Sequence, residues 1–521
     1  MRTQLADRVR ALGRRRVDLH WTHLFGVVTL ACLLVLAVTG ILLAVPYAPS
    51  SDLVTYAGPY TPLVGTQVSE AFASTMAISL EQPGGLLLRQ THHWAALVLP
   101  AAMIVQILAT FFTGGFRRPR RLSWVLLIAL FLVVLAGGWS GYALPDDMLS
   151  GTGLRIVEGV VMAIPVVGTR LVALLFGGRF PGEIIEHLYP VHLFVVPGIV
   201  AVLMVARAGL AYRHGAARLP RAGLSTASQR GLRLWPDVAV RAAGMTAITS
   251  AVLIVLGATA TVSPIWSYGP TAAGNVGAGS QPDWYTGFLD GALRLVPAGW
   301  ETEWFGFTWT FAILVPLAVI GGYFLVVFAY PFLESWVVGD TADQQVLDRP
   351  RNVPARTGIG VAGALFYGVL WGAASADVVA TRFGLSFESI ITTLQVVLLL
   401  GPPVAYELTR RICIGLQRRD REVAAHGRET GRIVRLADGG YVEVHAPVRA
   451  DERAALLTEA VAARPARLDA SGRLPRRERL RQSLSRGFAE GHARPTEAPD
   501  PADALEPARP EHARAGVGPV R

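Results

Sequence analysis

The sequence predicts an all-α fold, a polytopic transmembrane helix bundle of about eight helices. Two observations predict it. The 521-residue chain is 52% hydrophobic with a mean hydropathy of +0.41. Its apolar residues also fall in runs of about 20, the length at which a helix crosses a bilayer. The predicted spans lie at roughly residues 24–45, 92–112, 124–144, 188–210, 240–262, 306–330, 358–378 and 390–409.

Arginine is concentrated at the N-terminus and in alternate loops. Residues 1–19 are basic, and the first span has no small-residue cleavage pattern after it, so we expect it to be retained. Loops rich in Lys and Arg stay on the cytoplasmic side, which predicts a multi-pass protein of the cell membrane with both termini in the cytoplasm. The net charge of +10 follows from this bias, so no nucleic-acid partner is expected. The loop arginines are Arg117, Arg118, Arg120 and Arg121, and then Arg207, Arg213, Arg218 and Arg221.

The loops on the opposite side are longer and poorer in positive charge, at roughly residues 46–87, 145–187 and 263–305. The two cysteines, Cys32 and Cys413, lie far apart, so the sequence predicts no disulfide framework. It also lacks a C-x-x-C-H site for covalent haem. Any haem must therefore be non-covalent and held by histidine.

The second and fourth spans carry histidines near the same end. His92 and His192 are ionisable residues in apolar runs, which are costly and are functional hypotheses by default. A lone histidine of this kind often bonds a backbone carbonyl in the core, but a matched pair on two helices can hold one planar haem by axial ligation. Arg89, one turn before His92, is suited to a haem propionate. His93 points about 100° away from His92 and is expected to pack or bond locally.

Two glycines in the first span agree with flat groups beside the backbone. Gly26 and Gly40 are fourteen residues apart, about 21 Å of helical rise and nearly a whole number of turns. They permit close approach at two depths. Ordinary small-residue packing between membrane helices explains them equally well.

Four motifs together resemble cytochrome b of the quinol:cytochrome c oxidoreductase (bc) complex, closest to the menaquinol-oxidising actinobacterial form. The resemblance covers about residues 18–448. The motifs are R-x-x-H at Arg89–His92, G-Y-A-L-P-D-D-M-L-S-G-T-G at Gly141–Gly153, H-L-F-V-V-P-G at His192–Gly198, and P-I-W-S-Y-G-P followed by P-D-W-Y at Pro282–Tyr285.

The resemblance implies a domain plan. Residues 1–19 would be a basic cytoplasmic N-terminus, and residues 20–235 the haem-binding four-helix bundle. Residues 236–410 would hold the C-terminal helices with the P-D-W-Y loop, and residues 411–521 a cytoplasmic tail. We expect a short hairpin at residues 427–448, around Asp438-Gly439-Gly440. The tail from about residue 465 is rich in Arg, Ala, Pro and Glu and is expected to be disordered.

The resemblance also implies a quinol-oxidation site on the outer face, where the family has P-E-W-Y or a close variant. Asp283 would accept a proton from menaquinol, with Tyr285 and Pro282 in the same segment. Aspartate is one methylene shorter than glutamate, and a carboxylate that only caps a helix is the simpler alternative. Tyr142, Pro145 and Met148 would form the facing wall of the pocket.

The sequence departs from the family at the second, inner haem. Fourteen residues after His92 the family's ligand position holds Gln106, and about fifteen residues after His192 it holds Arg207. Ala109 stands where the family has an arginine for the inner propionates. Arginine has no acceptor atom and neither side chain suits axial ligation. The sequence therefore predicts one haem b and a gap of about 20 Å in the usual electron path.

These observations predict a cytochrome b-like subunit of a respiratory quinol:cytochrome c oxidoreductase that cannot run the full bifurcated cycle unaided. By resemblance its partners are a Rieske iron–sulfur subunit and a cytochrome c subunit, within a homodimeric complex. The alternative is a non-catalytic haem- or quinone-binding membrane subunit used in assembly, regulation or sensing. A pure scaffold would need none of Arg89, His92, His192 and Asp283. A transporter is disfavoured because the spans lack paired broken halves with midplane carboxylates.

Overall fold

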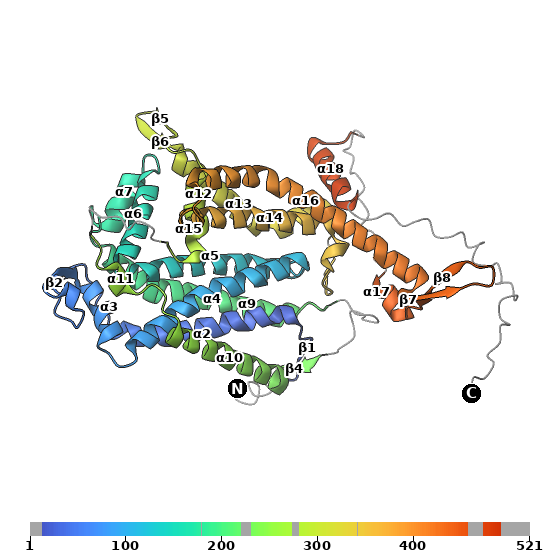
Figure 1. The fold of residues 1–521 in the computed structure, drawn as a ribbon, viewed down its shortest axis with the longest axis horizontal. Helices are drawn as coiled ribbons and strands as arrows, with labels where there is room; N and C mark the ends of the chain where they lie inside the picture. Colours follow the sequence, from blue (N-terminus) through green and yellow to red (C-terminus); the bar gives the residue numbers. More distant parts are fainter. Residues whose placement is uncertain are drawn as a thin grey trace.

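The computed structural model of the chain describes residues 13–178, 180–219, 231–272, 281–340, 342–456 and 473–490. Within these residues eight helical segments are long and apolar enough to cross a membrane, which confirms the predicted fold class. Their helices run roughly parallel to one long axis in Figure 1. They are α2 (Leu24–Ala44), α4 (Gly85–Phe112), α5 (Arg121–Ala143), α8 (Ile184–Pro190) continuing into α9 (Val196–His214), α10 (Ala239–Thr259), α13 (Phe311–Val338), α14 (Pro354–Ala374) and α16 (Phe387–His426).

The first half of the chain forms one helix bundle. Helix α2 packs on α4, α5 packs on α9, and α10 lies against both α2 and α4. Between α8 and α9 the backbone adopts one wide π-helical turn, η3 (Val191–Val195), which carries His192. Such turns are often found at functional sites. The bundle interior is filled by apolar side chains, among them the buried Cys32, Leu99, Met103 and Leu127.

The second half packs beside the first. Helix α12 (Gly287–Arg294) and α16 both lie on α14, while α13 contacts α5 and α14 contacts α4. Aromatic contacts join these helices, with the ring of Phe288 5.8 Å from that of Phe324 and 5.2 Å from that of Tyr367. Because α12 follows directly on the P-D-W-Y segment, this packing brings that segment against α4.

Short elements cover one end of the bundle, the end at the left of Figure 1. The hairpin of β2 and β3 precedes α3, and α6 and α7 form a second layer beside it. These segments belong to the three loops predicted to face outward. The elements are β2 (Leu53–Thr55), β3 (Gln67–Ser69), α3 (Glu70–Leu80), α6 (Met148–Met162), α7 (Gly168–Phe176), α11 (Ile265–Tyr268), β5 (Glu301–Trp304) and β6 (Phe307–Thr310), with α15 (Ala376–Phe383) between α14 and α16.

The opposite end carries β1 (Arg16–Val17) paired with β4 (Leu232–Arg233), and the C-terminal elements. The predicted hairpin is confirmed there. Strands β7 (Arg428–Arg435) and β8 (Tyr441–Ala446) pair antiparallel, with Arg435 opposite Tyr441, so Asp438-Gly439-Gly440 lies in the turn. Helix α17 (Ala450–Leu456) follows. The N-terminal pair and this hairpin therefore share the end predicted to be cytoplasmic (Figure 1).

One segment of the tail, which composition predicts to be largely disordered, is helical. Residues 476–490 form a helix, α18 (Arg476–Glu490), that packs on α13 and α14, with Arg481 and Ser485 buried and the guanidinium of Arg477 5.9 Å from the Trp336 ring. Composition predicts disorder because a polar segment buries little apolar surface by itself. Here the partner surface is supplied by two membrane helices, which composition does not reveal. The rest of the tail from residue 465, at 465–472 and 491–521, lies outside the described residues, as do Arg221 and residues 1–12.

Candidate functional site: a histidine pair beside a buried carboxylate

The two histidines predicted as haem ligands face each other inside the first bundle. The ring centres of His92, on α4, and His192, on η3, are 6.3 Å apart. Metal–nitrogen bonds of about 2 Å, with each ring centre about 1 Å beyond its nitrogen, place the centres of two axial imidazoles roughly 6 Å apart. The spacing therefore suits one iron between the rings.

The hydrogen bonds of the Nδ1 atoms determine which nitrogen of each ring is available. Nδ1 of His92 lies 2.8 Å from the hydroxyl of Thr39, and that hydroxyl donates to the carbonyl of Val35 at 2.6 Å. Nδ1 of His192 lies 3.1 Å from the carbonyl of Gly137. Both rings thus carry their proton on Nδ1 and donate it to an oxygen, which leaves Nε2 as the lone-pair nitrogen, as a metal ligand requires.

Glycines make room for a flat group on both sides of this pair. A Cβ atom on Gly40 would stand 3.2 Å from Cε1 of His92, and one on Gly141 would stand 2.5 Å from Cε1 of His192. Gly26 faces Gln106 instead, at 3.4 Å from Nε2. Gly141 begins the G-Y-A-L-P motif but was not predicted as a haem-side glycine.

Arg89 has a donor without a partner. Its side chain is buried, Nη2 reaches the carbonyl of Ser263 at a long 3.5 Å, and Nε has no hydrogen-bond partner in the part of the chain that the structure describes. A buried, unpaired guanidinium nitrogen is costly and fits an anionic group such as a propionate. The histidine pair, the glycines and Arg89 together fit a non-covalent b haem.

Asp283 lies on the other side of α4, in a buried polar cluster. Its side chain is 7% exposed, and both carboxylate oxygens accept hydrogen bonds. Nε2 of His93 lies 2.9 Å from Oδ1 and 3.1 Å from Oδ2, and the hydroxyl of Tyr285 donates to Oδ2 at 3.0 Å. Burial, with the neighbouring carboxylate, raises the pKa of Tyr285 well above its usual value, so Tyr285 stays a neutral donor.

This cluster corrects the expectation for His93. Its partner is 190 residues away and not local. An ionisable residue in a membrane span needs a partner. The presence of His93 beside His92 in an apolar run therefore could have indicated a polar partner from another segment. The alternative reading of Asp283 as a helix cap also finds no support, since its side chain makes no capping hydrogen bond at the N-terminus of η5 (Trp284–Thr286).

The G-Y-A-L-P-D-D-M segment lies close to this cluster. Gly138 on α5 is directly beneath the Tyr285 ring, where a Cβ would stand 2.6 Å from Cζ, and Tyr142 is one turn further along the same helix. The hydroxyl of Tyr142 donates to the carbonyl of Leu149 at 2.7 Å. Pro145, Met148 and Pro282 are half-buried in the two segments.

Asp146 and Asp147 join these segments. The backbone N–H of Thr271 donates to the carbonyl of Asp146, and that of Met148 donates to the carbonyl of Gly269. Asp147 caps α6 by accepting from the N–H of Ser150 at 2.8 Å. Burial raises the pKa of both carboxyls. The start of α6 and the residues before it are therefore bonded to residues 269–271, which precede the P-D-W-Y segment in the chain.

The structure also places the residues at the positions where the family has its inner haem ligands. Oε1 of Gln106 and Nε of Arg207 are buried without hydrogen-bond partners among the described residues, and Ala109 is buried. Fourteen residues before Gly141, the equivalent depth on α5 holds Leu127, which is 1% exposed within the apolar core. None of these inner positions holds a histidine.

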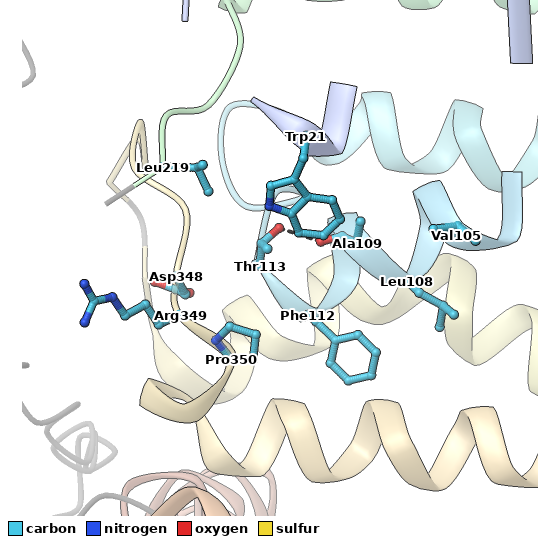
Figure 2. Close-up of a pocket in the computed structure, with 10 residues that line it drawn as sticks. All are labelled: Trp21, Val105, Leu108, Ala109, Phe112, Thr113, Leu219, Asp348, Arg349 and Pro350. Atoms are coloured by element: carbon cyan, nitrogen blue, oxygen red, sulfur yellow. Dashed lines mark hydrogen bonds between the residues drawn. The ribbon is translucent and has the colours of Figure 1, made fainter. Parts of the chain in front are cut away.

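A cavity of about 600 Å³ lies at the far end of α4. Figure 2 shows Trp21 over Thr113 and Ala109, with Asp348 beside them and Arg349 pointing away. Ala109 is seventeen residues from His92, about 25 Å along the helix. The cavity is lined mainly by apolar side chains, and apart from Ala109, at the family's inner-propionate position, it contains none of the residues named above for the haem or the quinol. It is separate from the site described above.

Comparison with known proteins identifies the family of this chain. Residues 97–270 match the family model described as "Cytochrome b(N-terminal)/b6/petB". The cytochrome bc1 complex cytochrome b subunit of Streptomyces coelicolor is 41% identical over 434 residues, which cover 83% of this chain and 79% of that protein. The chain belongs to the cytochrome b subunits of bc1 complexes.

Other relatives agree. The same subunit of Corynebacterium efficiens is 38% identical over 86% of this chain and 82% of its own length, and that of Mycobacterium tuberculosis is 40% identical over 82% and 78%. A solved structure titled "Hyperthermophilic respiratory Complex III" shares the fold, with a TM-score of 0.55 at 17% identity over 76% of this chain and 94% of that chain. The resemblance to an actinobacterial cytochrome b is confirmed. The protein is an integral membrane subunit of a respiratory oxidoreductase, in a family that normally binds haem b.

Proposed function

We propose that this cytochrome b oxidises menaquinol at a site on the outer membrane face and holds one haem b per chain. The complex would include a Rieske iron–sulfur subunit and a cytochrome c subunit and would be a homodimer. The observation that carries the proposal is the position of Asp283. Its buried carboxylate bonds His93, the residue next to His92, so the proposed proton acceptor lies against the helix that carries a candidate haem ligand.

In this chemistry the chain's own residues hold the quinol ring and accept a proton. Oxidation of a quinol to a quinone releases two protons and two electrons. The Rieske subunit would accept one electron and the haem the other, and the second proton would pass to water. An ionised Asp283 takes one of the protons at a carboxylate oxygen, while Tyr285 donates to that carboxylate and keeps it in place. Tyr142, Pro145, Met148 and Pro282 form the walls.

His92 and His192 would hold the haem through Nε2, with Arg89 at a propionate. When bound, the haem supplies a one-electron acceptor beside the quinol site. The Nδ1–H groups, held by Thr39 and by the Gly137 carbonyl, keep both rings in the ligating tautomer.

Residues on three helices support the proposal of a single haem. At the inner depth α4 offers Gln106, α9 offers Arg207, and α5 offers Leu127 where Gly141 makes room at the outer depth. A leucine in place of a glycine removes space beside a macrocycle, and the core around it is closely packed. The absence of both ligands and of the space beside them supports a single haem.

We further propose that both termini face the cytoplasm. The arginines at residues 117–121 and the paired strands β1 and β4 lie at the same end of the bundle, with eight spans between the two chain ends. Arg117 and Arg120 donate to the backbone carbonyls of Val346 and Gln344, so this basic loop packs against the segment that follows α13.

The test uses the purified complex with a menaquinol analogue. Asp283→Asn is expected to lower the turnover at least about 100-fold, since general-base catalysis contributes factors of this size, with an unchanged haem spectrum. Asp52→Asn, an exposed carboxylate in another outer loop, serves as the control and should retain full turnover. Full activity of Asp283→Asn would remove the proposed role of Asp283.

The second candidate function, a non-catalytic haem- or quinone-binding subunit, is favoured by the loss of inner ligands at Gln106 and Arg207. The same preparation separates the two. Haem reduction by quinol supports the catalytic subunit, and a haem that dithionite reduces but quinol does not supports the alternative.

A further inference from the structure

His93 and Asp283 contact each other. The geometry of α4 points His93 away from the pair formed by His92 and His192. Consecutive residues on a helix point about 100° apart, so His92 faces the bundle interior and His93 faces the P-D-W-Y segment. The two side chains of the pair are 16% and 7% exposed. Hydrogen bonds to an ionised carboxylate are about twice as strong as neutral ones, and more so away from water.

The backbone of the segment is held by other contacts. The indole Nε1 of Trp284 donates to the carbonyl of Leu97 on α4 at 3.3 Å, and the indole of Trp371 on α14 donates to the carbonyl of Trp284 at 3.0 Å. The hydroxyl of Thr286 donates to the carbonyl of Asp283 at 2.8 Å. Removing the His93 imidazole therefore leaves the loop anchored and frees only the Asp283 side chain.

Two donors define the direction of the carboxylate. Tyr285 comes from the same segment as Asp283, whereas His93 comes from a different helix. A single donor would allow the carboxylate to turn about its χ angles. Donors on two sides restrict it to one orientation, and a misplacement of about 1 Å can cost a factor of about 100 in rate.

We propose that His93 is a positioning residue for quinol oxidation, which orients the Asp283 carboxylate through the Nε2–H···O hydrogen bond. The proposal rests on the proposed function of Asp283. The short aspartate side chain, in a motif where the family has glutamate or a close variant, is held by a donor from α4 and so meets the quinol in a defined geometry. His93 itself does not touch the reacting atoms.

Three variants test the hydrogen bond. His93→Gln keeps an N–H donor close to the position of Nε2, His93→Asn keeps the amide on a shorter side chain, and His93→Leu removes the donor. In the assembled complex we expect kcat to fall about 100-fold in His93→Leu and nearly as far in His93→Asn, with KM within about twofold. His93→Gln should recover most of kcat. The haem spectrum should be unchanged in all three.

A double variant distinguishes positioning from a separate effect. If His93 acts through Asp283, then His93→Leu combined with Asp283→Asn is no slower than Asp283→Asn alone. A further loss in the double variant would overturn the proposal, as would wild-type kcat in His93→Leu or loss of haem in His93→Gln. If Asp283→Asn itself keeps full turnover, the proposed function fails. If Asp283→Asn is slow and His93→Leu is fast, only the role of His93 fails.

Discussion

The Nδ1 atom of His92 lies 2.8 Å from the hydroxyl of Thr39, which itself donates to the carbonyl of Val35. The hydroxyl has one proton and has given it away, so it accepts the proton of the imidazole. This contact joins α2 to α4 at the depth of the candidate haem. It occupies Nδ1 and leaves Nε2 of the ring free of this hydrogen bond.

Thr39→Val should weaken haem binding. The variant leaves a buried Nδ1–H without an acceptor, and loss of such a partner typically costs 10–100-fold in metal affinity. We expect faster transfer of haem from the purified protein to apomyoglobin. Thr29→Val is the matched control, because Thr29 is buried on the same helix and donates only to its own helix, at Phe25. Equal haem loss in both variants would contradict the role of Thr39.

The chain should contain one b haem. Pyridine haemochrome analysis of the purified protein should give one haem per chain, lost in His92→Ala and in His192→Ala because each removes an axial ligand. Gln106→Ala should retain the full haem content. Two haems per chain would show that the register placing Gln106 and Arg207 at the inner ligand positions is wrong.

Glycine substitutions should distinguish the outer haem position from the inner one. Gly141→Ala puts a Cβ 2.5 Å from His192 Cε1, too close for any real contact, so the ring must move and haem content should fall strongly. Gly26→Ala meets Nε2 of Gln106 at an ordinary 3.4 Å and should bind haem as the wild type does. The readout is the ratio of haem absorbance to protein. Similar losses in both variants would argue for general packing damage and against a haem-side role of Gly141.

A buried ion-pair network outside the site should control stability. Arg356 is 3% exposed in its side chain and pairs with Glu334 at 2.6 Å through Nη2 and 2.8 Å through Nε, and with Asp348 at 2.6 Å. Arg356→Met leaves the buried Glu334 charge unpaired, which costs about 3–5 kcal/mol. The expected result is a clear drop in the thermal unfolding midpoint in detergent.

The double variant Arg356→Met with Glu334→Leu should unfold at a higher temperature than the single variant, because the unpaired charge is gone. Glu407→Gln, which removes a solvent-exposed pair with Arg410 and Arg411, should leave the midpoint unchanged. A single variant as stable as the wild type would contradict the structural role of Arg356.

Much of the fold was predictable because the bilayer sets the length of an apolar helix. Each of the eight apolar runs became a spanning helix, and the hairpin around Asp438-Gly439-Gly440 followed from alternating residues about a turn. The histidine pair was predictable for a related reason. His92 and His192 stand near the same end of two spans, so helical rise alone puts them at one depth.

Partners across the fold were not predictable in this way. The depth of a residue in the membrane follows from counting residues along a span. The direction in which its side chain points depends on how the helices rotate and pack against one another. His93 was expected to bond locally, yet packing of the P-D-W-Y segment on α4 gave it Asp283 as a partner 190 residues away. Helix α18 was expected to be disordered, because its stabilising surface belongs to α13 and α14.

By itself, the sequence determined the membrane class, the number and position of the spans, the family, and the depth of the histidine pair. Those features depend on local runs, motifs and a fixed rise per residue. Only the tertiary structure decided the Thr39–His92 contact, the His93–Asp283–Tyr285 cluster and the glycine beside each ring. These depend on contacts between residues distant in the chain, and their free energies arise only when the helices pack.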